Sequence, residues 1–286
     1  MKKHITFIAI LTVCMAFSSC NKNTYCDTKL PTSEDVPNTT MAAENPYRSQ
    51  YLVDSITWYD SPDNHKETKY IYDEDNHLVR RVITGQILEA GVIRDFRYET
   101  EFEYSNGLVS SIIEDGRLTT RLYYDNQNRI TKMEYYGRDI YFHYLNGKVV
   151  SIYEGEDVFH NGFLVYDEYG DAVKYVSFDP DLNLFGEPID GTCHPREFSF
   201  TYDHGVKPNF GLDYLFVYQP IPGMGTAVPA YARELSLSNL TSCYGSTWTY
   251  TYNELGLPVT IRERWDGVTP ANDPHSTIYY KKKQGN

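Results

Sequence analysis

Two acidic residues and an asparagine at alternating positions are the first residues that could do chemistry. Asp179, Asp181 and Asn183 lie in DPDLNLFGEPID, where oxygen-bearing side chains stand at the spacing that calcium loops use. Leu184 stands where such a loop needs glycine for its sharp turn, and Pro180 is a poor fit. We therefore interpret the segment as a plain acidic loop that contains a weak calcium candidate.

The histidines and cysteines do not form a recognisable catalytic or zinc motif. Cys193 and His194 are neighbours, and neighbours on a strand point to opposite faces, so a Cys–His nucleophile would need a loop there. No Gly-x-Ser-x-Gly, P-loop or dinucleotide fingerprint occurs, and no zinc-ligand spacing is found. We predict no catalytic residue and no cofactor.

The sequence leaves open whether the protein has an internal disulfide. Cys193 and Cys243 can form a bridge in an oxidising envelope. Each of them precedes a repeat tyrosine, Tyr202 or Tyr252, by nine residues, which suggests equivalent strands. Strands two apart in a regular meander lie ~9–10 Å from each other, beyond the reach of a disulfide.

The aromatic side chains of a long irregular segment are the candidates for ligand binding. Residues 207–237 lie inside an insert, residues 179–247, that is longer than ordinary loops and too aromatic for disorder. Such a segment can cap an open end of a rolled sheet, or it can line a pocket for a glycan or peptide. The aromatic residues expected in that pocket are Phe210, Tyr214, Tyr218, Tyr231 and Trp248.

A short repeat builds the framework that must position these residues. Tyr or Phe, one residue, then Tyr and a turn recurs in YIYDEDNHL, FEYSNGL, LYYDNQNRI, FHYLNGKV and YTYNELGLPV. Asn106-Gly107 and Asn146-Gly147 are strong hairpin signals, because a type I′ turn needs φ > 0 at both central residues. Aspartate after the repeat tyrosine is interpreted as a turn former, since Ser105, Leu145 and Asn253 replace it in other copies.

The strand RYETEFEY shows how each repeat unit meets the core. Tyr98, Thr100, Phe102 and Tyr104 share one face, and charged residues occupy the other, so the strand is half buried. Short strands at ~8–12-residue spacing indicate an antiparallel meander of repeated hairpins. Because open twisted sheets rarely exceed ~10 strands without curling, we expect an all-β sheet that is rolled or closed into a barrel-like shell.

The N-terminus carries an export signal. Lys2 and Lys3 precede the apolar run ITFIAILTVCMAF, which is shorter than the ~20 residues that span a bilayer. Small residues directly before Cys20 resemble a bacterial lipoprotein signal, which implies cleavage after residue 19 and lipidation, including palmitate, of Cys20. An ordinary secretory signal is the alternative. We expect a signal peptide at 1–19, a lipidated flexible tether at 20–49 and one all-β domain at 50–286.

Composition restricts the partners. The net charge of −13 argues against nucleic acid and against anionic membrane surfaces. The 27 tyrosines outnumber the 3 tryptophans, which is typical of half-buried strand positions. The expected partners are the membrane, through the lipid anchor, and a glycan or an envelope protein.

Two resemblances follow from these motifs. Tyr-Asp-x-x-Asn-Arg-Ile at 124–130 resembles the YD (Rhs-type) repeat of bacterial surface and toxin proteins. YDHGVKPNFGL, LSLSNLTS and YTYNELGLPVTI, together with the export signal, resemble uncharacterised Bacteroidota lipoprotein domains with a porin-like β fold. The resemblance implies a fold and an outer-membrane location, facing either the periplasm or the outside, and carries no catalytic residues.

The sequence thus favours a lipid-anchored envelope protein that binds a ligand or acts as a scaffold without catalysis. A glycan-directed hydrolase is one alternative, and it would need two carboxylates that converge in a cleft. An integral outer-membrane β-barrel is the other alternative, although a lipid-facing strand would need an apolar outward band that RYETEFEY lacks.

Overall fold

A computed structural model describes residues 31–38, 45–154, 162–179, 194–215, 227–243, 245–265 and 274–285. Within these ranges the protein has seventeen strands, one α-helix and one short 3₁₀ helix. Several site residues that the sequence predicts lie outside the described residues, among them Cys20, Asp181, Asn183, Cys193 and Tyr218. None of the described helices has the length and hydropathy of a membrane-spanning segment.

The larger sheet is an antiparallel meander of fourteen strands. In sheet order these are β13 (Thr201–Val206), β14 (Ser238–Cys243), β15 (Ser246–Tyr252), β16 (Pro258–Trp265), β17 (His275–Lys282), β1 (Tyr51–Ser61), β2 (Asn64–Tyr72), β3 (Leu78–Glu89), β4 (Val92–Ser105), β5 (Leu108–Glu114), β6 (Arg117–Tyr124), β7 (Ile130–Tyr135), β8 (Arg138–Leu145) and β9 (Lys148–Glu154). The first strand therefore pairs with the last, which joins the two ends of the domain.

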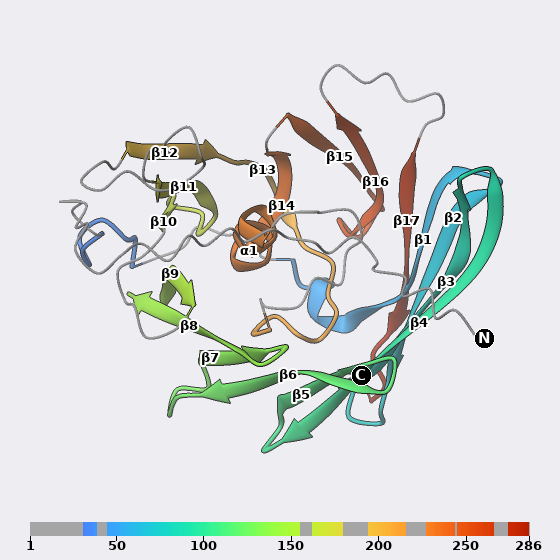
Figure 1. The fold of residues 1–286 in the computed structure, drawn as a ribbon, viewed down its shortest axis with the longest axis horizontal. Helices are drawn as coiled ribbons and strands as arrows, with labels where there is room; N and C mark the ends of the chain where they lie inside the picture. Colours follow the sequence, from blue (N-terminus) through green and yellow to red (C-terminus); the bar gives the residue numbers. More distant parts are fainter. Residues whose placement is uncertain are drawn as a thin grey trace, which may run out of the picture.

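A smaller sheet stands between the two edges of the larger one. It contains β10 (Gly162–Tyr166), β11 (Ala172–Asp179) and β12 (His194–Ser199). Figure 1 shows the two sheets curling around a centre that holds α1 (Ala227–Leu235). The predicted all-β meander is confirmed in its rolled form, whereas hydrogen-bonded closure is not observed, because β9 and β13 do not pair with each other.

The two ends of the shell have different turns. One end, which we call the tip rim, carries tight turns with positive φ, such as Asp115-Gly116 and Tyr136-Gly137. The opposite end, which we call the ladder rim, carries the predicted Asn106-Gly107 and Asn146-Gly147 turns and also four longer turns. Since even strands from β2 to β10 all end there, every turn of the repeat motif lies at the ladder rim.

The longer turns confirm that aspartate after the repeat tyrosine forms the turn. Asp125 Oδ1 accepts hydrogen bonds from the backbone N–H groups of Gln127 (2.8 Å) and Arg129 (3.0 Å). Asn128 takes the positive φ of 61° that this turn requires. The equivalent turns begin at Asp73, Asp167 and Asn253.

Eight tyrosines form a hydrogen-bonded ladder inside the shell; in the copy YTYNELGLPV the ladder residue is Tyr250, whereas the repeat tyrosine Tyr252 donates to Asp203 Oδ2. Each phenol donates to a backbone carbonyl near the start of an earlier strand, at 2.7–2.9 Å. The eight tyrosines are Tyr72, Tyr104, Tyr124, Tyr144, Tyr166, Tyr202, Tyr250 and Tyr280. Burial raises the pKa of these phenols well above the ordinary value, so they remain neutral donors.

The ladder also joins the two sheets where backbone pairing stops. Tyr166 of β10 donates to the carbonyl of Val149 in β9 (2.7 Å). Tyr202 of β13 donates to the carbonyl of Ala172 in β11 (2.8 Å). The tyrosines therefore continue around the shell across both edges of the small sheet.

Residues 207–215, at the start of the predicted irregular segment 207–237, fill the interior near the ladder rim. Phe210 lies against Tyr70 with ring centroids 5.0 Å apart, and Leu215 is buried. Lys207 Nζ donates to the carbonyls of Arg233 (2.6 Å) and Ser236 (2.9 Å) at the C-terminal end of α1, where a positive charge is favoured. The segment 207–215 thus acts as an internal plug that also holds the helix.

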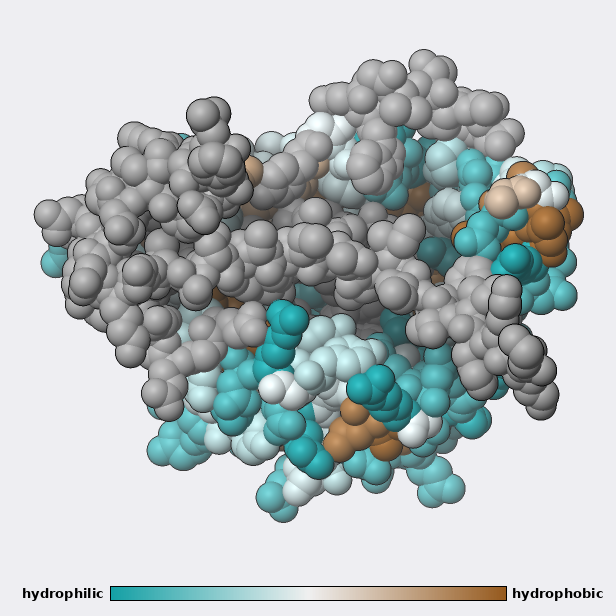
Figure 2. Space-filling model, viewed as in Figure 1, coloured by the Kyte–Doolittle hydropathy of each residue, from teal (hydrophilic) through white to brown (hydrophobic). Residues whose placement is uncertain are grey.

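RYETEFEY is buried over only part of its predicted face. Thr100 and Phe102 are buried as predicted, but Tyr98 is 40% exposed. The reason is length, because β3 and β4 have 12 and 14 residues and extend beyond the plug. The apolar face continues along this overhang without a cover among the described residues, and Figure 2 shows an apolar patch at one edge of the molecule.

Candidate functional site

An interior pocket near the tip rim is the candidate site. Because strand residues alternate between faces, Trp58, Trp248 and Glu263 all face the interior above the plug. The full lining is Trp58, Arg233, Leu240, Trp248, Tyr250, Ile261, Glu263, Pro274, His275 and Ser276. We call this pocket the chamber; its volume of about 20 Å³ has room for a water-sized group.

Cross-strand pairing sets the aromatic walls of the chamber. Trp248 on β15 is directly opposite Glu263 on β16, and Trp58 on β1 is opposite Lys66 on β2. Lys66 Nζ lies 5.0 Å from the centroid of the Trp58 ring, a cation–π contact. One wall thus offers an indole beside an ammonium group, and the other offers an indole beside a carboxyl group.

Burial dominates the electrostatics of the chamber. It raises the pKa of Glu263 to about 7, while the positive charges of Arg233 and Lys66 oppose that shift. Burial likewise lowers the pKa of Lys66. Glu263 Oε1 is buried and has no hydrogen-bond partner among the described residues. An unpaired buried carboxyl oxygen costs free energy unless a bound molecule or water satisfies it.

The central helix contributes the third charged group. Arg233 of α1 is only 5% exposed, and its Nη2 lies 2.9 Å from Glu234 Oε1. Since Lys207 binds the carbonyls at the end of α1, the plug fixes the position of this guanidinium. Arg233 therefore holds a fixed position in the wall of the chamber.

The chamber offers groups that can bind a ring-shaped ligand. Indole faces contact the apolar faces of ring-shaped ligands, and Glu263, Arg233 and Ser276 can exchange hydrogen bonds with hydroxyl groups. Glycoside hydrolysis needs two carboxyl groups on either side of the scissile bond. The described lining contains one carboxyl group, that of Glu263.

The predicted aromatic residues are distributed between the chamber and the core. Trp248 lines the chamber and is 9% exposed. Phe210 belongs to the plug, where it contacts Tyr70. The structure therefore brings Trp248 to a pocket and gives Phe210 a place in the core, and ligand binding by either remains a prediction.

The other predicted aromatic residues lie near the ladder rim or at the helix. Tyr214 is half-buried, and its hydroxyl accepts a hydrogen bond from the N–H of Val109 (3.2 Å). Tyr231 on α1 meets Phe142 edge-on with centroids 6.5 Å apart. Both rings are thus engaged by the chain itself.

The predicted calcium loop and disulfide are only partly covered by the structure. The backbone of Asp179 ends β11 and pairs with His194, while Asp181 and Asn183 lie outside the described residues. Cys243 ends β14 and is buried, which raises the pKa of its thiol to about 12. Because Cys193 lies outside the described residues, both sites stay predictions.

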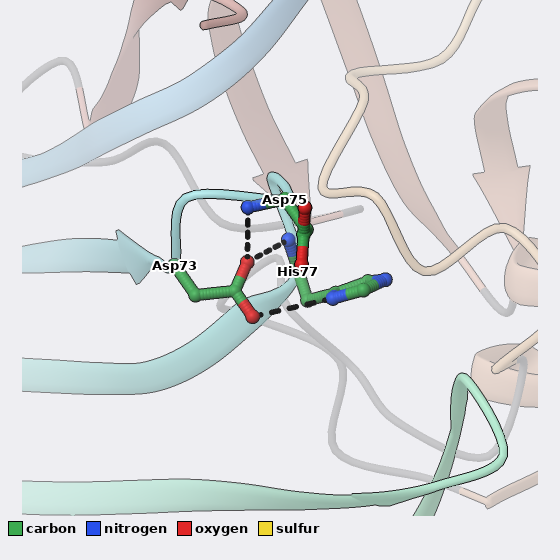
Figure 3. A group of neighbouring side chains, drawn as sticks. All are labelled: Asp73, Asp75 and His77. Carbon is green, nitrogen blue, oxygen red and sulfur yellow. Dashed lines mark hydrogen bonds and ion pairs between the residues drawn. The ribbon is translucent and has the colours of Figure 1, made fainter.

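A group of Asp73, Asp75 and His77 at the ladder rim has side chains close enough to hold a metal ion (Figure 3). The group is one of the repeated turns, and His77 Nδ1 lies 3.2 Å from Asp73 Oδ2. At the same position of the next such turn, Arg129 Nε donates to Asp125 Oδ2 (2.8 Å). Since arginine does not bind metals, the shared geometry is explained by the turn.

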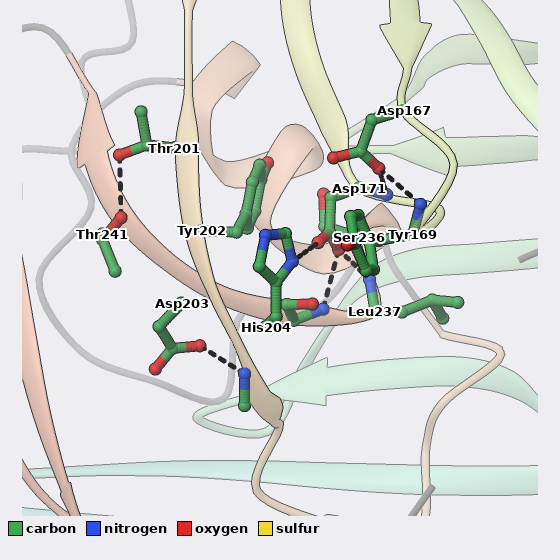
Figure 4. Close-up of polar contacts among 12 residues, drawn as sticks. Asp167, Tyr169, Asp171, Thr201, Tyr202, Asp203, His204, Ser236, Leu237 and Thr241 are labelled. Carbon is green, nitrogen blue, oxygen red and sulfur yellow. Dashed lines mark hydrogen bonds and ion pairs between the residues drawn. The ribbon is translucent and has the colours of Figure 1, made fainter. Parts of the chain in front are cut away.

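A buried aspartate joins the small sheet to the large one (Figure 4). Asp171 is fully buried, and its Oδ1 accepts hydrogen bonds from the N–H groups of Leu237 and Ser238, both at 2.8 Å. His204 Nδ1 lies 3.5 Å from Asp171 Oδ2. Ser236 Oγ donates to the carbonyl of Ala232 (2.6 Å), so these residues do not form a Ser–His–Asp relay.

Of the residues that line the chamber, sequence reasoning named only Trp248. It missed the others, including the functional groups of Trp58, Glu263 and Arg233. A signal for Glu263 was present, because the Asn253 turn sets the hairpin register that places Glu263 opposite Trp248. No comparable signal exists for Trp58, which reaches the chamber only because β1 pairs with β17.

Comparisons with known proteins complete this description. No family model and no curated protein matches the chain. Among solved structures, a porin-like protein from Bacteroides uniformis is similar, with 12% identity over 80% of this chain and 98% of that chain and a TM-score of 0.37. A porin-like protein from Bacteroides vulgatus has 11% identity over 81% and 99%, with a TM-score of 0.35.

A third similar structure is the Tc holotoxin pore of Photorhabdus luminescens. Its identity is 13%, its TM-score is 0.23, and the match covers 76% of this chain but 12% of the toxin chain. All three likenesses are too weak to support an inference about function.

Proposed function

We propose that the protein is a lipid-anchored envelope protein that binds a glycan in the chamber without catalysis. The observation that carries the proposal is the interior pocket in which Trp58 and Trp248 flank Glu263, whose Oε1 has no partner among the described residues. Because the chamber has room only for a water-sized group, a sugar hydroxyl would enter it and satisfy the buried carboxyl group, and the sugar ring would contact the indoles once these move apart.

The anchor part of the proposal rests on the export signal that ends at Cys20. It is tested on protein isolated from membranes of the producing cell. Mass spectrometry of the N-terminal peptide should show an acylated Cys20, and Cys20→Ala should move the protein to the soluble fraction. An unmodified N-terminus that begins elsewhere would contradict the anchor and leave the chamber unaffected.

Binding is tested with the full chain on a glycan array, followed by tryptophan-fluorescence titration with the glycans that bind. Trp58→Ala should weaken binding at least about tenfold, because one aromatic wall is lost. Tyr279→Ala is the matched control, since Tyr279 is an aromatic strand residue that is 50% exposed and does not line the chamber. Equal affinity of Trp58→Ala and the control, or no glycan bound, would contradict the proposal.

The same titration separates binding from hydrolysis. We expect bound glycans to be recovered intact, since the described lining has one carboxyl group. Release of shortened products that Glu263→Gln abolishes would favour the hydrolase alternative.

A further inference from the structure

A second cavity, of about 270 Å³, lies at the ladder rim. It is bounded by Arg129 after the Asp125 turn, by Lys148 after the Asn146 turn, and by Leu235 at the end of α1. This cavity is separate from the chamber, which lies toward the tip rim, and the two share no lining residue.

The two cations at this cavity differ in how they are neutralised. Arg129 is held by Asp125, with Nη2 2.7 Å from Oδ2, and its guanidinium lies 4.7 Å from the Tyr144 ring centroid. Lys148 Nζ lies 5.1 Å from the Tyr166 ring centroid and forms no hydrogen bond or ion pair within the described residues. Lys148 is therefore a half-buried ammonium group that still lacks an anionic partner.

Two nearby carboxylates act on Lys148 without forming an ion pair with it. Burial lowers the pKa of Lys148, and the charges of Asp167 and Asp171 oppose that shift. Neither carboxylate forms an ion pair with Lys148 among the described residues. Asp167 Oδ1 accepts backbone N–H groups of its own turn and Asp171 Oδ1 accepts those of Leu237 and Ser238, while Asp171 Oδ2 is buried and lies 3.5 Å from His204 Nδ1. An anion that reached Lys148 would meet an ammonium group with free donors.

Most of the remaining cavity wall is apolar, although Asn128 and Tyr214 also line it. Ile130 and Val149 are almost fully buried strand residues, and Leu235 faces them from the helix. The hydroxyls of Tyr144 and Tyr166 donate to backbone carbonyls of the ladder, so their rings mainly add apolar surface. The cavity thus combines one available cation with an apolar interior.

We propose that this cavity binds an amphiphilic anion, that is, an alkyl chain that carries a carboxylate or phosphate group. The headgroup would pair with the ammonium of Lys148, and the chain would lie against Ile130, Val149 and Leu235. The site is independent of glycan binding in the chamber.

The test is calorimetric titration of the full chain with four probes below their micelle concentrations: dodecanoate, dodecyl phosphate, dodecanol and inorganic phosphate. We expect the two alkyl anions to bind at least about tenfold more tightly than dodecanol, and inorganic phosphate not to bind. Equal binding of dodecanol would reduce the site to an apolar cavity, and binding of phosphate alone would reduce it to an anion site. Either result would overturn the proposal.

Variants of Lys148 test the headgroup contact. Lys148→Ala should weaken dodecanoate and dodecyl phosphate about tenfold or more, whereas Lys148→Arg should retain most of the affinity. Lys69→Ala, at an exposed lysine on β2, is the matched control and should change nothing. If Lys148→Ala keeps its circular dichroism spectrum, its melting temperature and full affinity, the proposal is wrong.

Discussion

The two rims of the shell use the same strands for different purposes. At the ladder rim, the ladder tyrosines donate to backbone carbonyls of earlier strands, and the aspartate or asparagine turns satisfy their own N–H groups. At the tip rim, Glu263 Oε1 lacks a partner among the described residues, and Leu88 and Val92 of the β3–β4 hairpin are more than half exposed.

This difference explains what the repeat does. Hydrogen bonds from side chain to backbone are concentrated at the ladder rim, although Asp115 Oδ1 at the tip rim also accepts the N–H of Glu99 (2.8 Å). Most residues at the tip rim are therefore freer to vary without loss of register. The chamber lies at the rim that has fewer hydrogen bonds from the repeat motif. This placement is expected if stability is concentrated at the ladder rim and binding at the tip rim. Substitutions at the two rims should therefore have opposite effects on stability.

The largest loss is expected at the ladder rim for Asp171→Ala. Removal of this fully buried carboxylate leaves the N–H groups of Leu237 and Ser238 without an acceptor. We expect the free energy of unfolding to fall by about 3 kcal/mol. Urea unfolding followed by circular dichroism measures it, with Asp75→Ala, at an exposed turn position, as the control. A loss below about 1 kcal/mol would show that Asp171 does not join the sheets.

Tyr166→Phe should give the next largest effect. The substitution removes one buried hydrogen bond, from the phenol to the carbonyl of Val149, and keeps the ring. We expect a loss of about 1–2 kcal/mol. Tyr123→Phe is the matched control, because Tyr123 is 43% exposed and its hydroxyl makes only a 3.4 Å contact with Glu134. Equal losses in both variants would contradict a stabilising role of the ladder.

These two predictions show which part of the fold was readable from sequence. The tyrosine spacing and the Asn-Gly turns are local signals, and they correctly predicted the meander and the turn role of Asp125. The overhang that exposes Tyr98 depends on how far the plug reaches, and no local pattern encodes that distance.

The chamber was less predictable because it is assembled by pairing between the two ends of the domain. Trp58 meets Ser276 only through the β1–β17 pairing. Lys207 reads as an exposed loop lysine in the sequence, yet its ammonium group binds the carbonyls at the end of α1. Such contacts join residues that are far apart in the sequence, and they depend on how the whole sheet rolls up. Sequence periodicity does not specify that arrangement.

At the tip rim, Glu263→Gln should stabilise the protein at high pH. The folded-state pKa of about 7 lies above the ~4.3 of an unfolded glutamate, so the folded state binds more protons between these values. Stability of the unsubstituted protein should therefore fall as the pH rises through that window. The glutamine variant should be more stable by about 1 kcal/mol at pH 8 and similar at pH 4.5, measured by urea unfolding at both pH values. A variant that is less stable at pH 8 would remove the contrast between the rims.

The smallest effect is expected at the N-terminal segment 31–38, which contacts the ladder rim. Val36 is buried, and Asn146 Nδ2 donates to the carbonyls of Ser33 (2.7 Å) and Val36 (2.8 Å). Asn146→Asp keeps a residue that tolerates the turn conformation but replaces the donor with an acceptor. We expect global stability to change by less than about 1 kcal/mol, while release of the segment raises its cleavage by protease roughly five- to tenfold.

The control for this last variant lies in the same kind of turn. Asn106 has a φ of 53°, close to the 48° of Asn146, and its side chain makes no hydrogen bond within the described residues. Asn106→Asp should therefore leave cleavage near 31–38 unchanged, as followed by mass spectrometry. If both variants are cleaved alike, the segment is not held by Asn146. If only Asn146→Asp is cleaved faster, the N-terminal segment 31–38 is fixed at the ladder rim by Asn146.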